Sequence, residues 1–148
     1  MNISVPLNRD ELEQCFSLMH VLRPHLSDQA RFADQIERQY NQGYVLLAAW
    51  EGKIPQGLMG YRIQENLLNG RFLYIDDLVV QPMLQRSGLG ARMIQEARTI
   101  AMQQRCAHLV LDTGLHMALA QRFYFRQGLL SRAMQFFEPL STANEARS

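Results

Sequence analysis

Apolar residues recur at helical spacing over the first part of the chain. The segment from about Asp10 to Leu22 places its apolar side chains on one helical face, and Pro24 follows it. A second amphipathic segment runs to about Tyr40, with Ser27 as its predicted N-cap and Gly43 just beyond its end. The sequence therefore begins with two predicted helices.

The pattern then changes to the period of two that is typical of strands. Three segments show it, at Tyr44–Trp50, about Gln56–Gln64 and Phe72–Val80. Asn69-Gly70 lies between the second and third segments and is a strong hairpin signal. Pro82 ends the third segment because it cannot continue a strand ladder. These strands are expected to pair in an antiparallel manner.

The second half of the chain alternates between helix and strand. A helix is predicted from about Gly88 to Gln104, a short buried strand at His108–Leu111, and a helix from about Met117 to Gln127 that ends at Gly128. A last strand is predicted at about Ala133–Phe137. This order indicates an α/β fold in one domain over residues 1–148. Its mixed central sheet would be flanked by helices, antiparallel at first and parallel around the central helix.

Composition narrows the class of protein. A chain of 148 residues is the size of one domain, and its 47% hydrophobic and 20% charged residues are ordinary for a globular protein. The net charge of +1 gives no reason to expect nucleic acid or a membrane as a partner. Cys15 and Cys106 are isolated, and charged residues stand where a signal peptide would be apolar, so a cytoplasmic location is expected.

The segment Gln85-Arg86-Ser87-Gly88-Leu89-Gly90 lies between a predicted strand and a predicted helix. The first N–H groups of a helix have no internal partners, and the positive end of the helix dipole lies there, so such a turn suits an anion. Gly88 and Gly90 let a phosphate approach the backbone, Arg86 offers a charge-assisted hydrogen bond, and Ser87 offers a hydroxyl. Taken alone, the same pattern also fits a glycine turn that caps an ordinary helix.

Three other phosphate motifs fit this segment less well. Walker A requires a lysine, which the segment lacks, and no kinase HRD or DFG sequence follows. A dinucleotide fingerprint is closer, because Asp112 follows the next strand at a suitable distance. Met93, however, stands at its third glycine position, and the connection is too long and too basic. A cradle for an acyl-coenzyme A pyrophosphate remains.

From about Tyr74 to Leu129 the chain resembles the GNAT (Gcn5-related N-acetyltransferase) superfamily, of the type that acetylates small-molecule amines. The superfamily motif Gln/Arg-x-x-Gly-x-Gly/Ala is matched by Gln85, Gly88 and Gly90. A second motif, Asn-x-x-Ala-x-x-φ-Tyr-x-x-x-Gly-Phe, commonly follows at this separation. The chain matches it at four positions and departs from it at two: Ala120, Phe123, Tyr124 and Gly128 agree, whereas Met117 and Leu129 differ.

The resemblance implies the GNAT fold, acetyl-coenzyme A as co-substrate, and no metal. The backbone of Leu78, Val79 and Val80 would pair with the pantetheine arm in the manner of an added strand. The strands around the cradle would splay apart to admit the cofactor. The turn would hold the pyrophosphate through a continuous set of residues: Gln85, Arg86, Ser87, Gly88, Leu89, Gly90 and Ala91.

Tyr124 is the candidate acid implied by the resemblance. A tyrosine at this helix position commonly lies near the coenzyme sulfur in the superfamily, where its phenol can protonate the departing thiolate. The alternative is a core aromatic residue, because Ala120, Phe123 and Tyr124 share one helical face.

Asp76 and Asp77 are adjacent acids inside a predicted strand. Strand geometry places successive side chains on opposite faces, so the two acids are expected to have separate roles. The segment Tyr74-Ile75-Asp76-Asp77 is similar to the Tyr-Leu-Glu-Asp stretch of polyamine acetyltransferases. Carried over, Asp76 is the candidate base, directly or through water, and Asp77 binds the amine. The alternative is a structural acid paired with Arg62 or Arg71.

These observations predict an N-acetyltransferase that moves the acetyl group of acetyl-coenzyme A to a primary amine of a small molecule, by direct attack in a ternary complex. No nucleic acid or membrane partner is expected, and a homodimer is compatible with the resemblance. One alternative is a protein or peptide N-acetyltransferase. The other is a catalytically degenerate acyl-coenzyme A-binding regulatory module, for which the departures at Met117 and Leu129 leave room.

Overall fold

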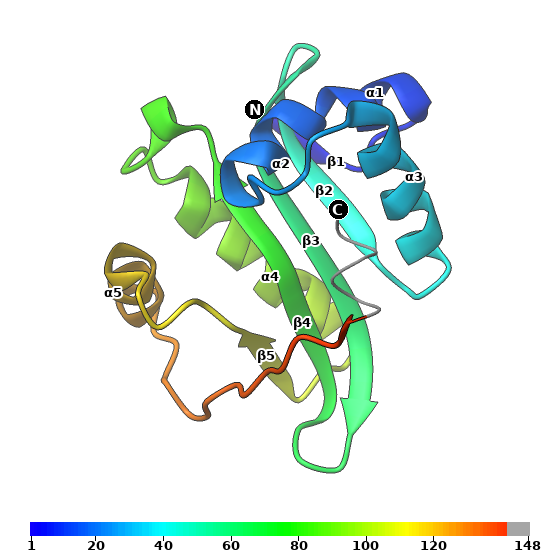
Figure 1. Ribbon diagram of the computed structural model, residues 1–148. Coiled ribbons are helices and arrows are strands. Elements are labelled where there is room, and N and C mark those ends of the chain that lie inside the picture. Colours follow the sequence, from blue (N-terminus) through cyan, green and yellow to red (C-terminus); the bar gives the residue numbers. More distant parts are fainter. Residues whose placement is uncertain (142–148) are drawn as a thin grey trace. The chain divides into compact units, whose positions relative to one another are not determined.

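A computed structural model describes residues 1–141 of the chain, which divides into two compact units, Met1–Leu111 and a second that begins at Asp112. The first unit contains a five-stranded sheet in the order β1-β2-β3-β4-β5 (Figure 1). Its strands are β1 (Asn2–Ser4), β2 (Val45–Glu51), β3 (Ile54–Asn66), β4 (Gly70–Val80) and β5 (His108–Leu111).

The sheet is mixed, as predicted. The pairs β1–β2, β2–β3 and β3–β4 are antiparallel, and the pair β4–β5 is parallel. The predicted hairpin is confirmed, because β3 and β4 pair up to Asn66 and Gly70 and Gly70 has a φ of 63°. β1 was not predicted, since three residues are too few to show a period.

Helices cover both faces of the sheet (Figure 1). On one face lie α1 (Arg9–Gln14), α2 (Phe16–Leu22) and α3 (Gln29–Tyr40), whose apolar side chains share a core with Leu46, Leu58 and Val79. We call this the α1–α3 face. On the other face lies α4 (Leu89–Gln103), so close that a Cβ on Gly57 would lie 2.7 Å from the Met93 sulfur. None of the helices within residues 1–141 is long and apolar enough to cross a membrane.

Two predictions at the N-terminal helices need correction. The single helix expected over residues 10–22 is divided at Cys15, which ends α1 and precedes α2. Ser27 is not the cap of α3. Asp28 takes that position, and its side chain accepts a hydrogen bond from the Arg31 N–H at 3.0 Å. Both residue types are good N-caps, so the sequence alone could not choose between neighbours.

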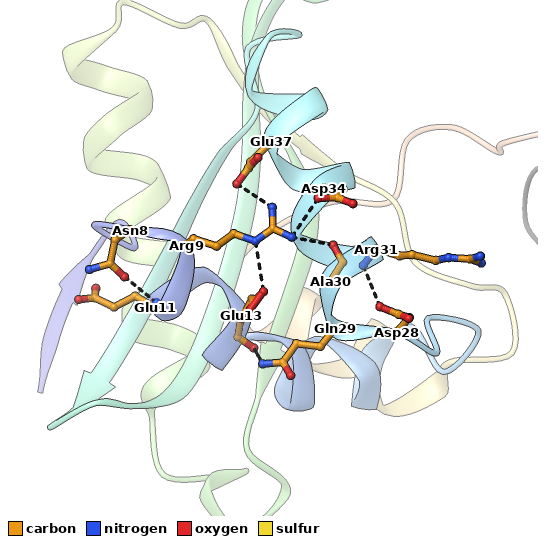
Figure 2. Close-up of polar contacts among 10 residues, drawn as sticks. All are labelled: Asn8, Arg9, Glu11, Glu13, Asp28, Gln29, Ala30, Arg31, Asp34 and Glu37. Carbon is orange, nitrogen blue, oxygen red and sulfur yellow. Dashed lines mark hydrogen bonds and ion pairs between the residues drawn. The ribbon is translucent and has the colours of Figure 1, made fainter.

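A cluster around Arg9 joins α1 to α3 (Figure 2). The guanidinium lies 3.2 Å from Glu13, 2.9 Å from Asp34 and 3.0 Å from Glu37, and it donates a hydrogen bond to the Ala30 carbonyl at 3.1 Å. Hydrogen bonds to Asp34, Glu37 and Glu13 raise the pKa of Arg9, so it stays charged. Because the cluster is largely solvent-exposed, each ion pair contributes little to stability, and the cluster serves to link α1 to α3.

The second unit contains α5 (Ala118–Arg126). Its predicted end is confirmed, since Gly128 has a φ of 90° and the Leu129 N–H donates to the Tyr124 carbonyl at 3.1 Å. The strand predicted at Ala133–Phe137 is wrong. Residues 129–140 have no regular structure, and Phe136 is 85% exposed. A strand requires a hydrogen-bonded neighbour, and an apolar run alone does not provide one.

Candidate active site

The C-terminal half of β4 has an open edge in the first unit. β4 pairs with β3 as far as Val80, whereas its pairing with β5 ends at Ile75 and Leu111. Beyond Ile75, β4 therefore continues without β5 beside it, because β5 ends at Leu111. The splaying of these two strands stays a prediction. An unpaired strand edge presents N–H and C=O groups to an incoming partner. This stretch contains Leu78, Val79 and Val80, which the resemblance assigns to the pantetheine arm.

The turn after β4 is held at its start and exposed in its middle. The Gln81 N–H donates to the Gln56 carbonyl at 2.8 Å, which keeps the end of β4 against β3. A short 3-10 helix at Pro82–Leu84 follows. Arg86 and Gly88 then adopt left-handed backbone conformations, with φ of 69° and 90°. Residues 85–88 are all exposed, so this part of the turn is accessible to a ligand.

The turn leads directly to the unpaired N–H groups of α4. The first hydrogen bond of the helix runs from the Arg92 N–H to the Gly88 carbonyl at 3.0 Å, so the N–H groups of Leu89, Gly90 and Ala91 have no acceptor within the helix. Ser87 Oγ is 3.4 Å from the Leu89 nitrogen, which is at most a weak contact. A Cβ built on Gly88 would meet no atom within 4 Å. Such N–H groups at a helix N-terminus are suited to an anion, which agrees with the predicted role of the turn without testing it.

Asp76 and Asp77 lie on the same face of the sheet, so the prediction of opposite faces is wrong. Gly60 pairs with Asp77 while Tyr61 pairs with Ile75, which makes Asp76 an extra residue in β4. Such a bulge interrupts the strict alternation of side chains. Residues paired across strands share a face of the sheet. Gly60 pairs with both Asp77 and Leu46, and Leu46 belongs to the core beneath α1, α2 and α3, so Asp77 lies on the α1–α3 face.

Asp76 forms a two-point ion pair with Arg62. Arg62 Nε donates to Oδ2 at 2.9 Å, and an Arg62 terminal nitrogen donates to Oδ1 at 2.8 Å. The hydrogen bond to Asp76 raises the pKa of Arg62, whose guanidinium also lies 5.9 Å from the centre of the Tyr74 ring. Arg62 and Arg71 were the two arginines predicted from the sequence as possible ion-pair partners of the acids. Arg62 has this role, whereas Arg71 donates to Gln104.

Both carboxylate oxygens of Asp77 have a protein partner. The Tyr44 hydroxyl donates to Oδ2 at 2.8 Å, and Arg23 Nε donates to Oδ1 at 3.0 Å. Arg23 also donates to the Asp76 backbone carbonyl at 2.8 Å, so it ties the residue after α2 to the bulge. Burial and then Asp77 raise the pKa of Tyr44 well above its usual value, which keeps its hydroxyl protonated as a donor. No local pattern in the sequence indicates Arg23 or Tyr44 as a partner of Asp77.

Gly60 makes room for this contact. Tyr44 is only 2% exposed, and its ring lies across Gly60. A Cβ at position 60 would overlap the Tyr44 hydroxyl and neighbouring ring atoms. The glycine is therefore required by the close approach of Tyr44 to Asp77.

A polar hollow of about 400 Å³ lies beside Asp76 on the α1–α3 face. Three α3 side chains recur at helical spacing on one stripe of the helix, the turn after α3 supplies one more, and β3 and β4 supply the rest. The residues that line it are Gln35, Arg38, Gln39, Gln42, Arg62 and Asp76. Of these, the sequence singled out only Asp76 as a site residue. The polar stripe on α3 is visible in the sequence, but it reads as an ordinary exposed helical face.

Tyr124 belongs to α5 in the second unit. Its side chain is half-buried, and its ring packs edge-on against Phe123 with centroids 5.3 Å apart. Ala120, Phe123 and Tyr124 are each partly buried, as expected for residues that share one helical face. Met117 is the N-cap of α5 and supplies no side-chain hydrogen bond there, whereas the asparagine of the motif could.

Residues 8–129 match the Acetyltransferase (GNAT) family, and the chain belongs to that family. A putative acetyltransferase from Agrobacterium tumefaciens shares its fold, with a TM-score of 0.79, 21% identity and coverage of 95% of this chain and 100% of the other.

Two aminoglycoside acetyltransferases are also similar. The 6'-N-acetyltransferase AAC(6')-IG from Acinetobacter haemolyticus has a TM-score of 0.74 and 19% identity, over 95% of this chain and 100% of the other. AAC(6')-Iy, solved with the bisubstrate analog CoA-S-monomethyl-acetylneamine, has a TM-score of 0.76 and 19% identity, over 94% of this chain and 98% of the other. The TM-scores show a shared fold. No curated protein is a significant sequence match.

Proposed function

We propose that the chain is an acetyl-coenzyme A-dependent N-acetyltransferase that acts on a primary amine of a small molecule. One observation carries this proposal: the open edge of β4 leads through the exposed Gly88 turn to the unpaired N–H groups of α4. Membership of the GNAT family and the coenzyme A analog bound by a protein of the same fold support it. The cytoplasmic location and the homodimer stay predictions from the sequence.

The proposed cofactor contacts follow the chain. The backbone of Leu78, Val79 and Val80 would hydrogen-bond the pantetheine arm, because no strand within residues 1–141 pairs with this edge beyond Ile75. The residues from Gln85 to Ala91 would hold the pyrophosphate, with backbone N–H groups at the start of α4 as donors. The exposed Arg86 side chain adds a positive charge beside them. When bound, the thioester supplies the acetyl group.

Asp76 is proposed to take the proton of the acceptor amine through a water molecule. Its two oxygens each accept one hydrogen bond from Arg62, and a carboxylate oxygen can accept a further one from water or an ammonium group. Because Arg62 holds both oxygens of this short side chain, a water relay suits Asp76 better than direct abstraction. Asp77 would act mainly by holding the bulge, since both of its oxygens have protein partners.

The function is tested by release of free thiol from acetyl-coenzyme A over polyamines, amino acids and aminoglycosides. We expect coenzyme A to raise the melting temperature, and at least one class of amine to release thiol. Asp76→Asn should slow turnover and leave coenzyme A binding unchanged. Failure of coenzyme A to bind in calorimetry would contradict the proposal. Binding without thiol release across the panel would favour a regulatory module.

Tyr124 is proposed to protonate or hydrogen-bond the departing thiolate. Tyr124→Phe should lower kcat roughly 30-fold, the size expected for one hydrogen bond to a charged group. The dissociation constant of coenzyme A should stay nearly the same, because the ring and its packing on Phe123 are retained. Steady-state kinetics and calorimetry measure the two effects. An unchanged kcat would assign Tyr124 to packing, and Phe123→Leu serves as a control for that role.

A further inference from the structure

Among the described residues, one cation of the polar hollow forms no ion pair. Asp76 and Arg62 neutralise each other through their two hydrogen bonds. Arg38 is exposed, and the ion pairs found within residues 1–141 do not include it. Two arginines against one aspartate give the lining a net charge of +1. A ligand in this hollow therefore meets a positive field near Arg38 and a carboxylate at Asp76.

The remaining lining groups are amides that can both donate and accept hydrogen bonds. Gln35 donates to the Gln39 side-chain oxygen at 2.9 Å, which leaves the Gln39 amino group and the Gln42 amide available. The volume of about 400 Å³ suits a small ligand. The polar lining suits a ligand with several hydrogen-bonding groups rather than an apolar one. The hollow also contains the side chain proposed to receive the acceptor's proton.

We propose that the acceptor is a small amine that also carries a carboxylate, as an α-amino acid does. Its amino group would face Asp76, and its carboxylate would face Arg38. Gln39 and Gln42 would hydrogen-bond its polar atoms. This assignment rests on the proposed acetyltransferase function and concerns the acceptor alone. A polycation such as a polyamine or an aminoglycoside would meet a net positive lining whose single carboxylate is already paired with Arg62, so it fits this hollow poorly.

The test uses the full chain with acetyl-coenzyme A and α-amino acids, each paired with the amine left when its carboxylate is removed. Serine with ethanolamine and lysine with 1,5-diaminopentane are two such pairs. We expect kcat/KM to be at least about 10-fold higher for the carboxylate-bearing member, the effect of one charge-assisted contact. Arg38→Gln should remove this preference, mainly by raising the KM of the amino acid.

Arg31→Gln is the matched control, because Arg31 is an exposed arginine of the same helix outside the hollow. It removes one positive charge from α3 and should leave the KM values of the amino acid and of its decarboxylated amine unchanged. Equal or better turnover of decarboxylated amines or aminoglycosides would overturn this inference while the proposed function stands. The inference would also be overturned if coenzyme A binds but no amino acid is either turned over or bound in calorimetry. Failure of coenzyme A to bind would instead contradict the proposed function itself.

Discussion

Gly60→Ala is expected to lower the free energy of unfolding by about 3 kcal/mol or more, a large effect for one methyl group. The added Cβ would overlap the hydroxyl and ring of Tyr44, which is 2% exposed and cannot move outward without leaving the core. Displacement of Tyr44 would also break its 2.8 Å hydrogen bond to Asp77. Urea unfolding followed by circular dichroism measures the change.

A double-mutant cycle identifies the cause of this loss. In a Tyr44→Ala background the ring is absent, so Gly60→Ala should be several-fold less destabilising there than in the parent protein. The Tyr44→Ala change is itself destabilising, so the free energy of unfolding is lower in that background. The comparison of the two Gly60→Ala costs stays valid. If Gly60→Ala costs the same free energy in both backgrounds, the close approach of Tyr44 is not the reason for the glycine.

The bulge at Asp76 could not be predicted from the sequence. The expectation of opposite faces applied strict alternation to Asp76 and Asp77, which is correct for a regular strand. A bulge depends on how two strands are paired, and here β3 supplies one residue fewer than β4 between the pairs at Gly60 and Tyr61. The consequence is functional, because both acids then lie among arginines on one face.

The partners of Asp77, which come from distant parts of the chain, could not be predicted from the sequence either. Arg23 and Tyr44 are 54 and 33 residues away from Asp77 in the sequence. Nothing in the local pattern at either residue indicates a contact with β4. The strand predicted at Ala133–Phe137 failed for a related reason, since strand formation depends on a neighbour that the period of two does not reveal.

The turn before α4 was predictable because its structure depends on the chain close to it. A strand that ends before Pro82, a glycine with positive φ and an amphipathic helix follow one another within a few residues. Helical periodicity is local, so it likewise predicts an inner face for α4. Leu89, Met93, Ile94, Ala97 and Ala101 are buried on it, whereas Ile100 is only partly buried.

Gly88→Asp is expected to weaken coenzyme A binding at least about 100-fold while the protein stays folded. The Cβ and carboxylate would enter the open space above the α4 N–H groups, where the pyrophosphate is proposed to lie. Two negative groups a few ångströms apart near a protein surface repel by several kcal/mol. Aspartate tolerates the positive φ of 90° better than most residues, and a carboxylate at a helix N-terminus is favourable.

Two variants separate charge from shape and from backbone strain. Gly88→Asn has nearly the same size as Gly88→Asp without the charge, so it should lose less affinity, and the difference between them should shrink as salt rises. Gly52→Asp introduces the same residue at another glycine with positive φ and open space, in the turn between β2 and β3. Its coenzyme A affinity should equal that of the parent protein in calorimetry. If Gly88→Asp also binds as the parent does, the pyrophosphate does not lie at the start of α4, and the observation that carries the proposed function no longer supports it.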